Sequence, residues 1–155
     1  MHHHPLQVCI RPAVQSDAHQ MAALDAATAS RPWRLEDFAA QGAQPGSLGA
    51  VAILSSGETA GFILCRCAAD EIEIYRMAVD ARCRRRGIGE RLLRDTLEQA
   101  RVRGITSAHL EVASSNRAAI ELYRKLGFQQ SYVRKNYYAE SRDDAVVMRL
   151  ELSKE

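Results

Sequence analysis

The feature that most constrains this chain is the run Arg84-Arg85-Arg86-Gly87-Ile88-Gly89, which stands between a predicted strand and the most regular predicted helix. The strand is predicted over 72–79. The helix is predicted to begin near Ile88, because apolar residues recur at helical spacing as far as Ala100 and Gly104 then stops it. Glycines at a helix entrance let backbone N–H groups converge on one anion, and the helix N-terminus adds partial positive charge. The junction therefore predicts a phosphate or pyrophosphate site.

Two familiar nucleotide motifs do not fit this junction. The Rossmann fingerprint needs a third glycine where Leu92 stands, and the P-loop needs Gly-Lys-Ser or Gly-Lys-Thr, which the chain lacks. Arginines alone would indicate no more than a solvated charged surface ahead of a helix. The two glycines favour anion binding over that alternative.

The remaining segments alternate between strand and helix patterns. The predicted order is a strand over 6–12, two helices over about 16–38, strands over 49–54, 59–67 and 72–79, the helix from 88, a strand over 107–112, a helix over 116–126 and a hairpin of 132–138 with 145–152. This order predicts an α/β fold whose first half is largely antiparallel.

Composition places the chain among globular proteins. With 155 residues, 46% hydrophobic and 26% charged, it predicts one domain over 6–155 behind a disordered or tag-like N-terminus over 1–5. A net charge of +2 is too small for binding nucleic acid or membrane through bulk charge. The longest apolar stretch, 50–54, falls far short of the ~20 residues of a membrane-spanning helix, and the start lacks a signal peptide's apolar segment. We therefore expect a cytoplasmic protein.

The histidines and cysteines do not predict a metal site. Cys9, Cys65, Cys67 and Cys83 lack the paired spacings of zinc and redox centres, so reduced structural thiols are expected. The terminal His2-His3-His4 run has no carboxylate partner and is typical of a tag remnant or a frayed end.

Three side chains are candidates for chemistry beyond the arginine run. Glu111 lies on the polar face of a predicted strand, where it could be a general base, although a solvated salt-bridge partner is the commoner role there. Tyr123 lies mid-helix, where an aromatic residue is ordinarily core, yet its hydroxyl could donate a proton. Asn116 could cap that helix or bind a ligand's amides. The residues alone favour the structural role for all three.

A family resemblance supplies context for these residues. The run over 79–93 resembles the acetyl-CoA-binding signature of the GNAT superfamily of N-acetyltransferases, which is Arg or Gln, two residues, Gly, any residue, then Gly or Ala; here these are Arg84, Gly87 and Gly89. The resemblance extends over nearly the whole chain. It implies the GNAT fold, a mixed, mostly antiparallel central sheet of about seven strands flanked by about four helices, with acetyl-CoA as co-substrate and no metal.

Within the superfamily the chain resembles the N-terminal acetyltransferases that modify the N-terminal alanine of a ribosomal protein. The resemblance rests on 31–38, 110–116, 122–128, 134–138 and 143–145. It implies that Glu111 is the general base and Tyr123 the general acid. The implied acetyl-CoA contacts are Met77, Ala78, Val79, Arg84, Arg85, Arg86, Gly87, Ile88, Gly89 and Asn116. The implied substrate contacts are Trp33, Tyr137 and Tyr138.

The implied partners are acetyl-CoA and the N-terminal peptide of a ribosomal protein substrate, with no nucleic acid or membrane, and the protein is expected to be a monomer or weak dimer. Glu73 matches the base position of histone-type members and is an alternative base. Arg34 stands where the subfamily often has Ser or Thr, so the substrate-side loop is expected to differ. The competing functions are acetylation of a lysine side chain or small amine, and non-catalytic binding of acyl-CoA or RNA.

Overall fold

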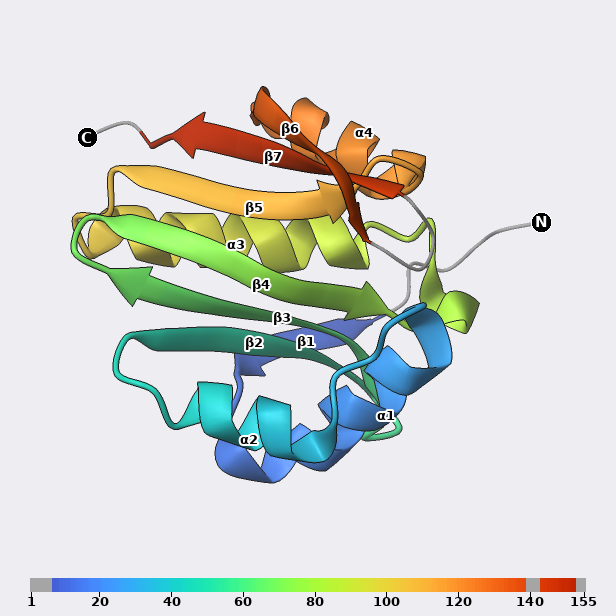
Figure 1. Ribbon diagram of the computed structural model, residues 1–155. Helices are drawn as coiled ribbons and strands as arrows, with labels where there is room; N and C mark the ends of the chain where they lie inside the picture. The colour runs from blue at the N-terminus through green and yellow to red at the C-terminus, as the bar shows by residue number, and fades with distance from the viewer. Residues whose placement is uncertain (1–6, 139–142, 153–155) are drawn as a thin grey trace. The chain divides into compact units, whose positions relative to one another are not determined.

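The computed structural model describes residues 7–138 and 143–152, apart from the side chains of Asn136 and Tyr138. Its elements, shown in Figure 1, are β1 (Val8–Pro12), α1 (Ala18–Thr28), α2 (Leu35–Gly42), β2 (Ser47–Leu54), β3 (Thr59–Ala68), β4 (Glu71–Val79), α3 (Ile88–Val102), β5 (Ser107–Ala113), α4 (Arg117–Lys125), β6 (Gln129–Tyr138) and β7 (Asp143–Glu151). No helix within these described ranges is both long enough and apolar enough to cross a membrane.

The strands form one sheet in the order β1-β2-β3-β4-β5-β7-β6. The pair β4–β5 is parallel, whereas β1–β2, β2–β3, β5–β7 and β6–β7 are antiparallel. The described part of the chain thus has seven strands and four α-helices, which confirms the predicted mixed, mostly antiparallel α/β fold.

The chain divides into two compact units. The first contains the residues up to Arg66 together with Arg76–Thr96, and the second contains Cys67–Tyr75 together with the residues from Leu97 onward. The strands β3 and β4 and the helix α3 each contribute to both units. The single domain over 6–155 stays a prediction, and the tag-like segment 1–5 lies outside the described residues.

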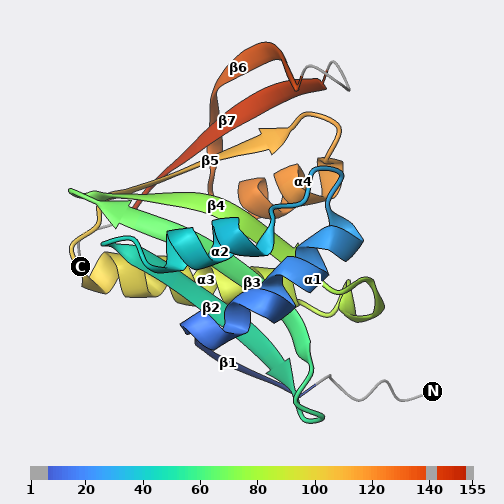
Figure 2. The same ribbon diagram turned by 60° about the horizontal axis from the view of Figure 1, so that its bottom comes forward.

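The core of the first unit lies between the helices α1 and α2 and the strands β2 and β3 (Figure 2). Its buried members are Ala18, Met21, Leu24, Phe38, Val51, Phe62 and Leu64. The ring of Phe38 packs edge-on against Phe62 with 5.4 Å between the ring centroids. Burying such a side chain contributes about 1.5–3 kcal/mol to folding. This core fixes α1 and α2, and with them the loop that joins the two helices.

The start of α2 differs from the prediction. Proline is favoured at the first position of a helix, so Pro32 predicts that the second helix opens there, but α2 begins at Leu35. The backbone N–H of Trp33 instead donates to Asp25 Oδ2 at 2.8 Å, and the N–H of Arg34 donates to Asp37 Oδ2 at 2.9 Å. The Asp37 carboxylate thus supports the first turn of α2, and the residues before it form a loop attached to α1.

In the second unit β5 lies between β4 and β7. Registered pairs run from Glu71 opposite Ser107 to Ile74 opposite Leu110, and on the other side Glu111 lies opposite Val147. Burial alternates along β5 as predicted, because successive strand side chains point to opposite faces. The closing hairpin of β6 and β7 is also confirmed.

Candidate active site

A short turn leads from the end of β4 toward α3 in the first unit. The Asp80 side chain accepts the Arg82 N–H at 2.9 Å, and the Asp80 carbonyl accepts the Cys83 N–H at 2.8 Å. The Arg82 guanidinium bonds both Asp80, at 3.1 Å, and Glu58, at 3.0 Å. The Arg82 side chain and the Arg82 backbone N–H, which both donate to the Asp80 carboxylate, hold the pKa of that carboxyl below its usual range. The turn is therefore fixed to β4 and to the β2–β3 connection.

The arginine run follows this turn and ends at the N-terminus of α3. Arg85 and Gly87 have φ values of 62° and 77°, so the backbone turns sharply just before the helix. Arg91 N–H donates to the Gly87 carbonyl at 3.0 Å and starts the helical ladder. The N–H groups of residues 88–90 thus have no helical partner, as at every helix start. Since the three arginines are exposed beside them, the local chemistry suits a phosphate group.

Replacement of Gly87 by alanine is expected to weaken acetyl-CoA binding. A Cβ at Gly87 meets no atom within 4 Å, so the cost arises from its positive φ alone and is about 1 kcal/mol of unfolding free energy. Gly57→Ala is a matched control, because Gly57 also has positive φ and open space around it. Urea unfolding should show similar losses for both variants, and calorimetric titration should show weaker acetyl-CoA binding only for Gly87→Ala. Equal acetyl-CoA affinities of the two variants would contradict a phosphate site at the start of α3.

Met77, Ala78 and Val79, the other predicted acetyl-CoA contacts of this unit, are partly buried at the end of β4. Gly61 of β3 faces them, and a Cβ there would lie 3.0 Å from the Ala78 carbonyl oxygen and 3.3 Å from Ile88 Cγ2. Sequence reasoning missed Gly61, although a glycine inside a strand pattern is a signal for close backbone approach. Only a glycine lets β3 lie so close to the Ala78 backbone and the start of α3.

Glu111 lies on β5 in the second unit and is bound by an arginine. Arg134 Nη1 of β6 donates to Glu111 Oε1 at 2.7 Å, and the Arg134 guanidinium lies over the Tyr137 ring, 3.8 Å from its centroid. The hydrogen bond to Glu111 raises the pKa of the Arg134 guanidinium above its usual value. The structure thus brings Glu111 together with the predicted substrate contact Tyr137. The side chain of Tyr138 lies outside the described residues.

The alternative base, Glu73, shares a face of the sheet with Glu111. Glu73 of β4 lies opposite His109 of β5, and Glu111 is two residues beyond His109 on the same strand. His109 Nε2 is 3.3 Å from Glu71 Oε1 and 3.3 Å from Ser107 Oγ. Because Glu73 and Glu111 are both exposed, this face offers two carboxylates to an incoming amine.

Asn116 and Tyr123 lie at the start and in the middle of α4. Asn116 Oδ1 accepts the Ala119 N–H at 3.3 Å, so it caps the helix, as the structural alternative predicted. Tyr123 is 7% exposed and packs its ring against Phe128 with 5.7 Å between centroids. The hydroxyls of Ser114 and Ser115 both donate to the Asp143 carboxylate and lower the pKa of Asp143. These bonds link the loop before α4 to β7.

Trp33, the remaining predicted substrate contact, lies in the loop between α1 and α2 of the first unit. Its ring is 5.3 Å from that of Phe38, and the Arg76 guanidinium lies 5.2 Å from the Trp33 ring centroid. It is half-buried. The substrate-side loop is therefore packed on one side against the helical core and on the other against β4.

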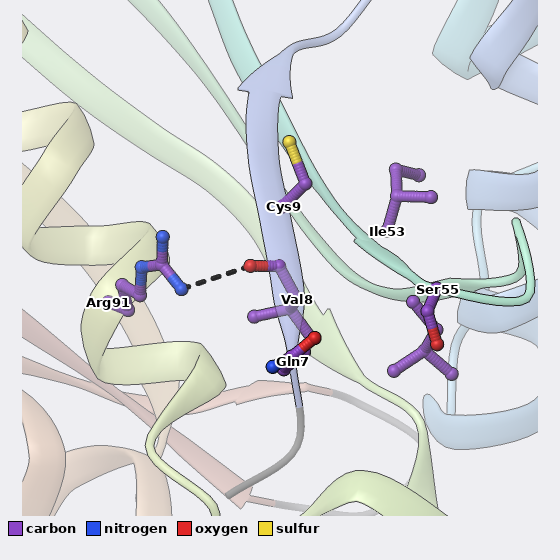
Figure 3. A pocket seen from close by; sticks show the side chains of 7 residues that line it. Gln7, Val8, Cys9, Ile53, Ser55 and Arg91 are labelled. Atoms are coloured by element: carbon purple, nitrogen blue, oxygen red, sulfur yellow. Dashed lines mark hydrogen bonds between the residues drawn. The ribbon is translucent and has the colours of Figure 1, made fainter.

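A pocket of about 560 Å³ lies elsewhere in the first unit, along β1, the end of β2 and α3. It is lined by Gln7, Val8, Cys9, Ile53, Leu54, Ser55 and Arg91. Figure 3 shows Arg91 directed at the backbone of β1, where its Nη1 donates to the Val8 carbonyl at 3.2 Å. None of these residues belongs to the predicted catalytic, acetyl-CoA or substrate sets.

Comparison with known families and sequences finds similarity to acetyltransferases. A model of the acetyltransferase (GNAT) family matches residues 18–128. The ribosomal protein bS18-alanine N-acetyltransferase of Escherichia coli strain K12 is 37% identical over 103 residues, which are 65% of this chain and 70% of that protein. The N-alpha-acetyltransferase RimI of Mycobacterium tuberculosis is 36% identical over 148 residues, 92% of this chain and 91% of that protein.

Solved structures agree with the fold. The crystal structure of the ribosomal-protein-S18-alanine N-acetyltransferase from Escherichia coli superposes with a TM-score of 0.89 at 30% identity, over 95% of both chains. Ard1 from Thermoplasma volcanium superposes with a TM-score of 0.83 at 26% identity, over 94% of this chain and 98% of that one. The structural similarity thus covers 94–95% of this chain.

Proposed function

The chain belongs to the acetyltransferase (GNAT) family, and on that premise we propose that it transfers the acetyl group of acetyl-CoA to the N-terminal α-amine of a protein. The alanine at the start of ribosomal protein bS18 is the proposed substrate. The observation that carries this proposal is the identity of 36% over 92% of the chain with an N-alpha-acetyltransferase, alongside 37% identity with a bS18-alanine N-acetyltransferase. The proposal also includes a cytoplasmic location and a monomeric or weakly dimeric state.

The first part of the proposal concerns acetyl-CoA. The pyrophosphate would accept hydrogen bonds from backbone N–H groups at the start of α3, with charge supplied by Arg84, Arg85 and Arg86. The N–H of Met77 or Ala78 would donate to the thioester oxygen as negative charge develops on it. Asn116 would contact the pantetheine arm while its Oδ1 continues to cap α4.

The second part concerns proton transfer. A peptide α-amine has a pKa of ~7.7–8.0, so a minority is neutral at pH 7 and a carboxylate such as Glu111 can take the remaining proton, directly or through a water. The nitrogen would then attack the thioester carbon. As the N–C bond forms and the C–S bond breaks, Tyr123 would donate its proton to the departing sulfur, and the second proton lost by the nitrogen as it becomes an amide would restore the Tyr123 hydroxyl. CoA and the acetylated peptide are the products.

Arg134 bears directly on the role of Glu111. The Glu111 carboxylate accepts a charge-assisted hydrogen bond from Arg134 at 2.7 Å, and the same oxygen atoms would accept one from a substrate ammonium. The substrate ammonium would compete with Arg134 for the same carboxylate. The pair is exposed, so releasing Glu111 from Arg134 would cost little, because exposed ion pairs contribute about 0–1 kcal/mol.

A second candidate function is acetylation of a lysine side chain or a small amine. The observation that favours it is the presence of Glu73 and Glu111 on one face of β4 and β5. Lysine has a pKa of ~10.4 and needs stronger deprotonation than an α-amine, for which two carboxylates would serve. Family membership counts against the non-catalytic acyl-CoA and RNA-binding alternatives.

A panel of peptides that differ only in their first residue tests the proposal. We expect kcat/KM with acetyl-CoA to be highest for alanine and about tenfold or more lower for bulky first residues, since one poorly accommodated side chain costs about 1.4 kcal/mol or more. Equal rates for every first residue, with spermidine acetylated as fast, would contradict the N-terminal assignment and favour the small-amine function.

A further inference from the structure

The loop between α1 and α2 is attached to β4 by one buried ion pair. Asp25, near the end of α1, is 2% exposed. Its carboxylate accepts hydrogen bonds from Arg76 Nε at 3.2 Å and Nη2 at 3.1 Å, both at Oδ1, and Arg76 Nη2 is 2.9 Å from Oδ2. The same Oδ2 accepts the Trp33 N–H at 2.8 Å. One buried carboxylate therefore joins the helix, the loop and the strand.

The Arg76 guanidinium contacts the loop at two further points. Nη2 donates to the Arg31 carbonyl at 3.1 Å, and the guanidinium lies 5.2 Å from the centroid of the Trp33 ring, within the range of a cation–π interaction. The planar guanidinium, with its five donors, can make these contacts at once, whereas a lysine ammonium cannot. All of these groups lie in the first compact unit.

The placement of this pair is not explained by stability alone. A buried ion pair is often no more stabilising than apolar residues of similar volume, because both charges lose hydration. Here the bonds of both partners go to the loop backbone and the Trp33 ring rather than to the core formed by α1, α2, β2 and β3. The pair therefore acts on the geometry of the loop.

We propose that Arg76 and Asp25 are positioning residues that hold the loop over 29–34, with Trp33, at a fixed place relative to the end of β4. Arg76 immediately precedes Met77 and Ala78, the proposed donors to the thioester oxygen, so the pair sets the substrate-side loop against the strand that carries them. The expected effect of the pair on peptide binding rests on the proposed function. Its effect on the position of the loop is independent of that function.

Trp33 makes the loop directly observable, because it is the one tryptophan in the sequence. The test variant is Arg76→Met, with Arg76→Lys as the conservative variant. Since Arg76→Met leaves the Asp25 charge buried without its guanidinium, the double variant Asp25→Asn with Arg76→Met provides a form that lacks both charges and is expected to retain the fold. Arg11→Met is the matched control, because Arg11 makes a similar bidentate pair with Asp17 at the other end of α1.

Acrylamide quenching of Trp33 fluorescence is the first measurement. We expect quenching to increase about twofold or more in Arg76→Met and in the double variant, as an ordered half-buried indole becomes mobile, with partial recovery in Arg76→Lys and no change in Arg11→Met. Circular dichroism with cooperative thermal unfolding checks that each variant is folded. Unchanged quenching in the folded double variant would overturn the proposal.

Steady-state kinetics is the second measurement. With the alanine peptide, we expect KM for the peptide to rise about tenfold in the double variant, which is about 1.4 kcal/mol of binding free energy, because the loop that carries Trp33 loses the bonds that hold it. The kcat at saturating peptide and the KM for acetyl-CoA should stay within twofold. A fall in kcat with an unchanged peptide KM would overturn the positioning role. If the wild-type protein fails to acetylate the peptide, the proposed function fails, and Trp33 quenching still tests the loop.

Discussion

Replacing Tyr123 with phenylalanine is expected to lower the rate of acetyl transfer about 100-fold while the Kd for acetyl-CoA stays unchanged, since a general acid typically contributes 10²–10⁴-fold. The substitution removes only the hydroxyl. The Tyr123 ring packs against Phe128 inside the second unit, and phenylalanine preserves that contact, so the fold should not change. A thiolate that must leave without a proton donor carries more charge in the transition state, and the barrier rises accordingly.

Single-turnover kinetics measures this effect without interference from product release, and equilibrium titration measures acetyl-CoA binding. Tyr132→Phe is the matched control, because Tyr132 lies on β6 in the same unit, is 56% exposed and loses the same hydroxyl. It should retain the wild-type rate. A wild-type rate in Tyr123→Phe would remove Tyr123 from the role of general acid.

Glu111→Gln is expected to lower kcat/KM for the peptide about 100-fold or more at pH 7, again within the range of general base catalysis. The substitution also removes the ion pair with Arg134, but that pair is exposed and its loss should change the unfolding free energy by less than about 1 kcal/mol. The defect should therefore appear in catalysis and not in stability.

The pH dependence of this defect has a definite sign. Below the amine pKa of ~7.7–8.0 the substrate is mostly protonated and needs a base, whereas above it the amine is already neutral. The ratio of wild-type to Glu111→Gln activity should therefore decrease as the pH rises from 7 to 9. Glu73→Gln is the matched control, because it removes a carboxylate from the same face of the sheet. A larger loss of activity in Glu73→Gln than in Glu111→Gln would identify Glu73 as the general base.

The sequence predicted the elements whose pattern is local. The helix α3 was predicted because its apolar residues recur at helical spacing, and Ile88, Leu92 and Leu93 are indeed buried. The strict alternation of polar and apolar residues predicted the polar face of β5. Asn116 was a candidate for the cap of α4, and it caps that helix. These features depend on neighbours within a few residues, which a sequence displays directly.

The features that were not predictable depend on residues far apart in the chain. Asp25 and Arg76 are 51 positions apart, and Asp25 also accepts the Trp33 N–H where the sequence predicted the first turn of the second helix. Glu111 and Arg134 are 23 positions apart. The residues alone favoured a salt-bridge role for Glu111, and the structure confirms that salt bridge; its role as a base stays a prediction.

The most direct test of the central claim is to locate the transferred acetyl group by mass spectrometry. The wild-type protein is incubated with acetyl-CoA and a peptide that begins Ala-Arg-Tyr and contains an internal lysine, beside a copy whose N-terminus is blocked. We predict one added acetyl group, on the α-amine of the unblocked peptide, and no product from the blocked copy. Acetylation of the lysine in both peptides would contradict the N-terminal assignment.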